Sequence, residues 1–342
     1  MGKSLAVKYR PTTFDAVTEQ GSVRAILQNQ LDNGEIKNAY IFVGSAGCGK
    51  TTCARIFANE INKGKGRPVE MDAASNNSVD DVREIAKMAQ TKSMDSDYKV
   101  FILDEVHMFS QGAWAAMLKL IEEPPARSIF IMCTTDYWKI PKTILSRSQR
   151  FTFNRISTQG IVDRLKYICG KEAIDMVGSV EDSAIEYIAR LSEGGMRDAI
   201  TTLDKCLAYS PELTMDNVVA ALGGSSFDEL FDLTYSVLYK EHDKVIEIVE
   251  KVYSRGEDMK QFVKSYLDFC MDLYKFFLTD ELTYTKFPDT KEMRVKITDL
   301  VSDYDDISEQ LNIIIQEIIR LDNTIKWSQS PKNIIEIALI TM

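Results

Sequence analysis

One segment of the sequence has the spacing of a phosphate-binding loop, G-x-x-x-x-G-K-S/T. Glycines in such a loop let the backbone curl until its N–H groups point at phosphate oxygens, and the N-terminus of the following helix adds partial positive charge. The lysine reaches the β- and γ-phosphates, and the hydroxyl after it can ligate Mg²⁺. The alternative is a glycine-rich turn with an exposed lysine. The predicted nucleotide-binding residues are Gly44, Ser45, Ala46, Gly47, Cys48, Gly49, Lys50, Thr51 and Thr52.

An acidic pair follows an apolar run farther along the chain. Asp104 and Glu105 come directly after the run 100–103. A carboxylate beside Thr51 can bind the metal, which makes Thr51 and Asp104 the predicted Mg²⁺ ligands. Glu105 can orient and activate an attacking water, so the pair favours hydrolysis over transfer to an acceptor. A solvated loop end is the alternative for the pair, and His107 can either couple the site to its neighbours or simply pack.

The elements around these residues predict an α/β fold with a parallel five-stranded sheet. Apolar runs of strand length alternate with helical patterns, as in a buried parallel sheet, and polar residues follow where the strands end. The helix that begins near Ser110 or Gln111 must stop at Pro124-Pro125. From about residue 157 the pattern is helical, with Gly194-Gly195 ending one helix and 223–226 a linker or a helix stop. The expected strands include 40–43, 100–103 and 129–133, with weaker candidates at 69–72 and 151–153.

Composition and charge exclude several classes of protein. The sequence of 342 residues is 45% hydrophobic and 27% charged, which is typical of a globular chain. No apolar run reaches the roughly 18 residues of a membrane span. Six scattered cysteines without a C-x-x-C pair indicate a reducing cytoplasm and no disulfide framework. Residues 1–162 have a net charge of +4 and residues 163–342 of −14, so an acidic chain can still present a basic surface to nucleic acid.

Several further motifs resemble those of the AAA+ clamp-loader ATPases, most closely the bacterial gamma/tau subunits and next the small subunits of replication factor C. The resemblance covers about residues 5–205. The motifs are Lys8-Tyr9-Arg10-Pro11 with Thr13-Phe14, Asp72-Ala73-Ala74-Ser75-Asn76-Asn77, Asp104-Glu105-Val106-His107-Met108, Leu120-Ile121-Glu122-Glu123-Pro124-Pro125 and Ile144-Leu145-Ser146-Arg147-Ser148-Gln149-Arg150-Phe151.

The resemblance implies a subunit of three parts and a function. A RecA-like ATPase domain would span 1–160, a helical lid 161–224 and a helical collar 225–342, with the collar joining five subunits in a ring. ATP would let the ring grip and open a sliding clamp, and primer–template DNA would trigger hydrolysis and release. Non-catalytic membership of the same ring, another AAA+ DNA-processing machine such as a Holliday-junction motor or helicase loader, and a P-loop metabolite kinase are the competing hypotheses.

The resemblance also assigns roles to individual residues. Thr134 or Thr135 falls at the sensor position of the fourth strand. Arg147 falls at the arginine finger, acting in trans on ATP of the neighbouring subunit, and Arg197 at the lid arginine that touches the phosphates of its own subunit. A guanidinium aimed at the γ-phosphate can accelerate hydrolysis by roughly 10³–10⁵; a surface salt bridge is the alternative for Arg147. Tyr9, Arg10 and Pro11 would lie along the adenine side.

Four features depart from the family pattern. The stretch 59–68 has no cysteine where bacterial members carry a zinc module, so we expect no zinc. Ser148 replaces a cysteine beside Arg147, and Glu19 stands where the family usually has glycine. The chain ends after the predicted collar, without a longer extension, which would suit a bacteriophage-encoded or otherwise minimal loader.

Contacts to DNA are expected at the phosphate backbone, without reading of the base sequence. Asn76, Asn77 and Ser78 precede a helical pattern whose free N–H groups could meet a phosphate. Arg83 and Lys119 are further candidates, and an ordinary solvated position is the alternative for each.

Overall fold

The computed structural model divides the chain into two compact units. It describes residues 4–91, 95–172, 180–222, 227–282, 285–287, 291–302, 307–325, 328 and 330–342. One unit comprises Met1–Ile168 with Ser192–Thr201, and the other comprises Cys169–Leu191 with Thr202–Met342. The division into three domains at 160 and 224 stays a prediction. Within the described residues, no helix is long and apolar enough to cross a membrane.

The first unit contains the expected parallel five-stranded sheet, in the order β2-β3-β4-β1-β5. Both weak strand candidates form strands, at the two edges of the sheet. Since β4 lies between β1 and β3, the residues that follow these three strands emerge side by side at one edge. The strands are β1 (Ala39–Val43), β2 (Val69–Asp72), β3 (Lys99–Asp104), β4 (Ser128–Thr134) and β5 (Gln149–Thr152).

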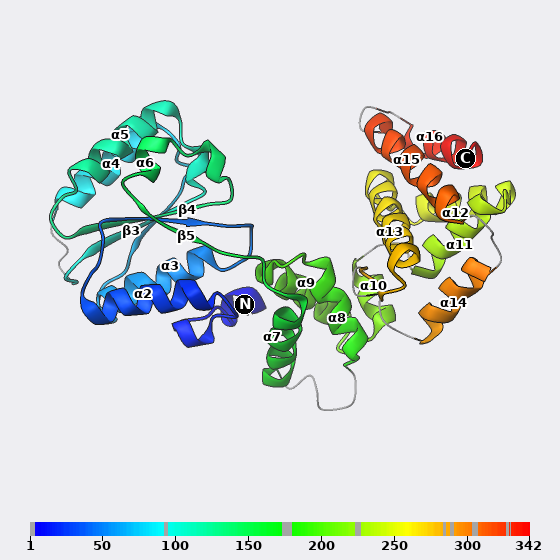
Figure 1. Cartoon of the computed structure of the whole chain (residues 1–342), viewed down its shortest axis with the longest axis horizontal. Coiled ribbons are helices and arrows are strands. Elements are labelled where there is room, and N and C mark those ends of the chain that lie inside the picture. Colours follow the sequence, from blue (N-terminus) through cyan, green and yellow to red (C-terminus); the bar gives the residue numbers. More distant parts are fainter. Residues whose placement is uncertain are drawn as a thin grey trace. The chain divides into compact units, whose positions relative to one another are not determined.

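Helices cover both faces of this sheet (Figure 1). On one face α2 (Gly21–Asn33) and α3 (Lys50–Ile61) pack against Tyr40, Phe42 and Ile102. On the other, α4 (Val79–Gln90), α5 (Gln111–Glu122) and α6 (Lys142–Leu145) pack against the alternate strand residues Ile41, Phe101 and Phe130. Alternate side chains of β1, β3 and β4 thus belong to two separate cores, one on each face of the sheet. The short elements are α1 (Leu5–Lys8), η1 (Phe14–Ala16), η2 (Val106–Met108) and η3 (Tyr137–Lys139).

The local signals for α5 and for the break at Gly194-Gly195 are confirmed. Ser110 Oγ accepts a hydrogen bond from the Ala113 N–H and so caps α5. The helix ends at Glu122, before the two prolines. Helix α8 (Asp182–Leu191) ends before the two glycines, and α9 (Met196–Tyr209) begins after them.

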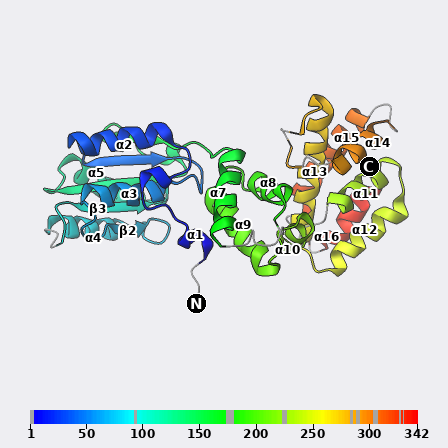
Figure 2. The same ribbon diagram turned by 90° about the horizontal axis from the view of Figure 1, so that it is seen from below.

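The remaining described residues are nearly all helical. Helices α11 to α16, labelled in Figure 2, contribute side chains to one apolar core. The predicted stripe Ile307, Leu311, Ile314 and Ile318 is buried in it. The expected linker 223–226 lies outside the described residues. These helices are α7 (Thr158–Lys171), α10 (Met215–Leu222), α11 (Phe227–Leu238), α12 (His242–Ser254), α13 (Met259–Thr279), α14 (Lys291–Ser302), α15 (Ile307–Ile325) and α16 (Pro331–Ile340).

A buried aromatic pair formed by β3 and β4 allows the fold to be tested. Phe130 is fully buried and stacks on Phe101 with ring centroids 5.2 Å apart. We expect Phe130→Ala to lower the free energy of unfolding by about 3–5 kcal/mol, because it removes buried contacts and leaves a cavity. Urea unfolding followed by circular dichroism measures this, with Trp138→Ala as the matched aromatic control, since Trp138 is 89% exposed. A loss below about 1 kcal/mol would contradict the placement of Phe130.

Candidate functional site

The predicted phosphate loop joins β1 to α3, and glycine is required at several of its positions. Gly47 and Gly49 have φ angles of 71° and 104°, in the left-handed region that other residues rarely adopt. A Cβ on Gly44 would lie 2.5 Å from the Phe153 carbonyl oxygen. The loop therefore passes close to its neighbours and leads straight into the N-terminus of α3.

Lys50, the first residue of α3, points back into this loop. It is only 5% exposed, and its Nζ donates to the carbonyl oxygens of Gly44 (2.8 Å) and Ser45 (2.7 Å). A buried ammonium needs such acceptors. Cys48 is also buried, and burial raises the pKa of its thiol. Cys48 is therefore a protonated, packed thiol rather than an exposed nucleophile.

Two hard oxygen ligands meet where β1 and β3 end. Thr51 Oγ1 donates to Asp104 Oδ2 over 2.7 Å, although 53 residues separate them in the sequence. A hydroxyl and a carboxylate at this spacing fit Mg²⁺, which usually takes one or two protein ligands together with water and phosphate oxygens. No cluster of three or more His, Cys, Asp or Glu residues suited to a metal occurs in the described part of the chain.

The second carboxylate of the pair lies in a polar network. Thr135 Oγ1 donates to Glu105 Oε2 over 3.1 Å. His107 Nδ1 lies 3.3 Å from the same carboxylate oxygen and 3.2 Å from Thr134 Oγ1. The ring nitrogen accepts from Thr134 when it is unprotonated and donates to Glu105 when it carries the proton. The structure thus joins both sensor candidates to Glu105, Thr135 directly and Thr134 through His107.

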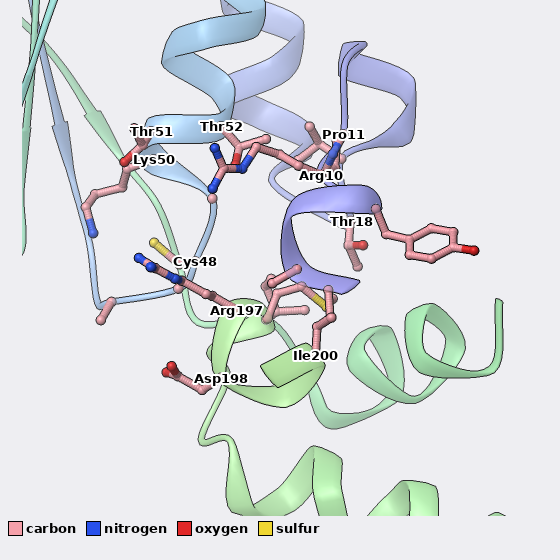
Figure 3. A pocket seen from close by; sticks show the side chains of 18 of the residues that line it. Arg10, Pro11, Thr18, Cys48, Lys50, Thr51, Thr52, Arg197, Asp198 and Ile200 are labelled. Carbon is pink, nitrogen blue, oxygen red and sulfur yellow. The ribbon is translucent and has the colours of Figure 1, made fainter. Parts of the chain in front are cut away.

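A cavity of about 450 Å³ opens beside the loop (Figure 3). Its volume is in the range of ordinary ligand sites. The predicted residues among those that line it are Tyr9, Arg10, Pro11, Ala46, Gly47, Cys48, Gly49, Lys50, Thr51, Thr52, Asp104, Glu105 and Arg197. Sequence reasoning did not identify Ala6, Val17, Thr18, Arg55, Ile156, Arg164, Met196, Asp198 and Ile200, which also line it. Gly44, Ser45, Thr134, Thr135 and Arg147 are not among the lining residues.

Arg197 reaches the cavity because α9 begins directly against the phosphate loop. The Met196 N–H donates to the Gly47 carbonyl oxygen over 3.1 Å, and a Cβ on Gly47 would lie 2.9 Å from Gly195 Cα. Only small residues on both sides permit this approach. In Figure 3, the Arg197 side chain extends from the first turn of α9 toward the loop that carries Cys48. Arg164 of α7 was missed because no motif surrounds it; its Nη2 donates to the Tyr9 carbonyl oxygen over 2.6 Å.

Arg147 lies outside the cavity, in the turn between α6 and β5. Its Nη2 is 2.9 Å from Glu122 Oε1, and its Nη1 donates to the Thr143 carbonyl and to Ser146 Oγ. The side chain is 43% exposed. This ion pair is compatible with both sequence hypotheses, because an exposed guanidinium can still serve a neighbouring subunit.

The expected DNA-contacting residues are mostly engaged within the chain. Ser78 and Asp81 form a reciprocal cap at the start of α4: the Ser78 N–H donates to the Asp81 carboxylate, and the Asp81 N–H donates to the Ser78 hydroxyl. Asn76 Nδ2 donates to the Asp72 carbonyl, and Arg83 pairs with Asp80 at 2.8 Å. Asn77 and Lys119 are exposed. Their contact with DNA stays a prediction.

Comparison with known proteins identifies similar chains along most of the sequence. Residues 69–157 match the family described as DNA polymerase III, delta subunit, and residues 160–212 match the clamp loader subunit ATPase lid domain of DNA polymerase III. The tau subunit of Bacillus subtilis DNA polymerase III is 33% identical over 97% of this chain and 62% of its own length. The gamma/tau subunit of Mycoplasma pneumoniae is 31% identical over 87% of this chain and 46% of its own length.

This chain spans only 46–62% of the length of these two relatives. Among solved structures, the Holliday junction branch migration motor RuvB of Thermotoga maritima has 20% sequence identity and a TM-score of 0.52. The superposition covers 67% of this chain and 79% of that one. At this identity the likeness concerns the fold alone.

Proposed function

Because this chain is a relative of the bacterial DNA polymerase III gamma/tau subunits, we propose that it is an ATP-hydrolysing subunit of a DNA sliding-clamp loader. The observation that carries the proposal is the meeting of Lys50, Thr51, Asp104 and Glu105 at one cavity, which Arg197 also lines. A phosphate cradle, two oxygen ligands, a candidate base and a cation are the groups that triphosphate hydrolysis needs.

Each group has a role that follows from its position. The loop N–H groups and Lys50 bind the phosphates, and Arg197 adds positive charge from α9. Thr51 and Asp104 would hold Mg²⁺, which would supply positive charge beside the phosphate oxygens. Glu105 Oε accepts the proton of the attacking water, while Thr135 fixes the carboxylate through its 3.1 Å hydrogen bond.

The adenine end of the cavity is built by the N-terminal segment. Tyr9, Arg10 and Pro11 would lie along the base, with Arg164 holding the Tyr9 carbonyl in place. Arg147, from the next subunit of a ring, would complete the site in trans. The helices beyond residue 224 would join the ring, which would bind a sliding clamp and primer–template DNA through backbone contacts.

Removal of the candidate base tests the proposal. We expect Glu105→Gln, assembled with its partner subunits, to retain ATP binding. Its rate of ATP hydrolysis should fall by about 10²–10⁴-fold, because the amide cannot accept the proton of the attacking water. Phosphate release with and without primed DNA and the cognate clamp measures this. Glu123→Gln, an exposed glutamate of the first unit, is the control. Unchanged hydrolysis in Glu105→Gln would contradict the assignment and would leave a non-catalytic ring subunit as the better interpretation.

The second candidate is the competing hypothesis from the sequence, another AAA+ machine such as a Holliday-junction motor that acts on branched DNA. The two functions differ in their assemblies. A clamp loader is expected as a pentamer with accessory subunits that binds a sliding clamp, whereas a branch-migration motor is expected as a hexamer of identical chains. Native mass spectrometry of the complex separates them.

A further inference from the structure

We propose that Glu19 is a positioning residue that fixes one wall of the nucleotide cavity by capping helix α7. The proposal rests on the proposed function for its nucleotide readout. Thr18, immediately before it, lines the cavity (Figure 3), and α2 begins two residues later at Gly21. Glu19 itself is not among the lining residues, so its effect on nucleotide must act through the elements it holds.

The Glu19 carboxylate sits at the N-terminus of α7. Oε1 and Oε2 accept from the Ser157 N–H at 3.3 and 3.2 Å, and Oε1 also accepts from the Ser157 hydroxyl. The Ser157 hydroxyl in turn accepts from the Gly160 N–H over 3.0 Å, and the Ser157 carbonyl accepts from the Ile161 N–H. Ser157 therefore caps α7, and Glu19 places a negative charge at the positive end of the helix dipole.

The neighbouring Gln20 fixes the same segment at a second point. It is 7% exposed; its side-chain oxygen accepts from the Asn154 N–H at 3.2 Å, and its Nε2 donates to the Asn154 carbonyl at 2.7 Å. Nε2 also lies 3.4 Å from the carbonyl oxygen of Cys48 in the phosphate loop. Residues 154–157 are thus held at both ends by consecutive side chains, and Ile156 between them lines the cavity.

The cap also acts on the far side of the cavity. Helix α7 carries Arg164, which lines the cavity and donates to the Tyr9 carbonyl. Fixing the start of α7 therefore fixes the guanidinium that holds Tyr9. A chain of contacts runs from Glu19 through Ser157 and α7 to Arg164 and Tyr9.

The backbone conformation at Glu19 is energetically unfavourable, and the hydrogen bonds of its side chain must offset that free energy. Glu19 and Gln20 have φ angles of 58° and 52°, and a left-handed conformation is unfavourable for residues with a Cβ. A glycine at position 19 would adopt this conformation without strain. The variant Glu19→Gly therefore removes the strain and the cap together, whereas Glu19→Ala keeps the strain and loses the cap. Comparison of the two separates the effect of the backbone strain from the effect of the lost cap.

The experiment uses the full chain and two readouts. Hydrogen exchange follows the amides of Ser157 to Ile161, and stopped flow follows release of a fluorescent ATP analogue. For Glu19→Gly we expect at least about fivefold faster exchange of these amides and about three- to tenfold faster release of the analogue, because loss of a helix cap costs about 1 kcal/mol, which is about fivefold in an equilibrium constant. The unfolding midpoint should be no lower than that of wild type, since the backbone strain is lost with the cap. Glu19→Gln, which keeps an acceptor but no charge, should fall between; Glu35→Ala, at another exposed glutamate, should match wild type.

Two results would overturn the proposal. One is wild-type exchange at 157–161 in Glu19→Gly, which would mean that the carboxylate does not cap α7. The other is faster exchange with unchanged nucleotide release, which would make the cap structural only. Failure of the wild-type chain to bind the analogue would instead count against the proposed function, and the exchange measurement, which needs no nucleotide, would still test the cap.

Discussion

Lys50→Ala is expected to abolish nucleotide-dependent binding of the sliding clamp. Lys50 is the buried cation at the base of the phosphate loop, and its Nζ already lies within hydrogen-bond distance of two loop carbonyls. Hydrogen bonds from an ammonium to an anionic phosphate are stronger than those to a neutral carbonyl, so ATP would draw the ammonium toward its β- and γ-phosphates. Removal of the group should weaken ATP binding at least about 100-fold, since two such bonds are lost.

The control for Lys50 must separate binding from folding. Lys50→Ala also leaves the Gly44 and Ser45 carbonyls without their donor, so the unfolding midpoint has to be compared with that of wild type. Lys65→Ala removes an exposed lysine of the same unit and should leave ATP affinity and clamp binding unchanged. Titration with a fluorescent ATP analogue and capture on immobilised clamp give the two readouts. ATP affinity within about threefold of wild type in a folded Lys50→Ala chain would show that the loop does not bind triphosphate through this residue.

The phosphate loop and the acidic pair could be predicted because their chemistry is local in the sequence. Gly47 and Gly49 need left-handed backbone, and the lysine and threonine must follow at once, so eight consecutive residues carry the signal. Asp104 and Glu105 could be predicted for a similar reason, because they directly follow the apolar run 100–103. Such signals depend only on residues that are adjacent in the sequence, so they can be recognised before the order of the strands is known.

The arrangement around Glu105 could not be predicted, since it depends on the order of the strands. Strand β4 is inserted between β1 and β3, although it comes after both in the sequence. The pairing of β3 with β4 brings Thr135 within 3.1 Å of Glu105 and His107 within 3.2 Å of Thr134. The sequence therefore left Thr134 and Thr135 as alternatives and His107 undecided.

The remaining cavity wall was missed for another physical reason. Thr18, Ile156, Arg164 and Ile200 come from four separated segments, and none has a neighbour that marks it as functional. Their residue types are also common in helices and loops, so the types alone do not indicate a binding site. Their shared location follows from the tertiary hydrogen bonds of Glu19, Gln20 and Met196, which link segments that lie more than a hundred residues apart in the sequence.

Arg147→Ala is expected to spare ATP binding and remove hydrolysis by the assembled ring. Arg147 does not line the cavity of its own subunit, so its loss should leave nucleotide affinity within about twofold of wild type. In trans, a guanidinium stabilises charge that spreads over the γ-phosphate in the transition state, and its loss lowers the rate by roughly 10³–10⁵. Phosphate release by rings assembled from the variant, with primed DNA and clamp present, measures the effect.

The ion pair with Glu122 allows this role to be separated from a surface salt bridge. Both side chains are about two-fifths exposed, and pairs of this kind contribute about 0–1 kcal/mol to stability. Arg147→Ala should therefore barely move the unfolding midpoint of the isolated chain, and Glu122→Ala should leave the guanidinium free to serve the neighbour. Arg150→Ala, which removes an exposed arginine that lies over the Tyr137 ring in the same segment, is the matched control. Wild-type hydrolysis by Arg147→Ala rings would show that the trans assignment is wrong and would favour the surface salt bridge with Glu122 as the interpretation of this residue.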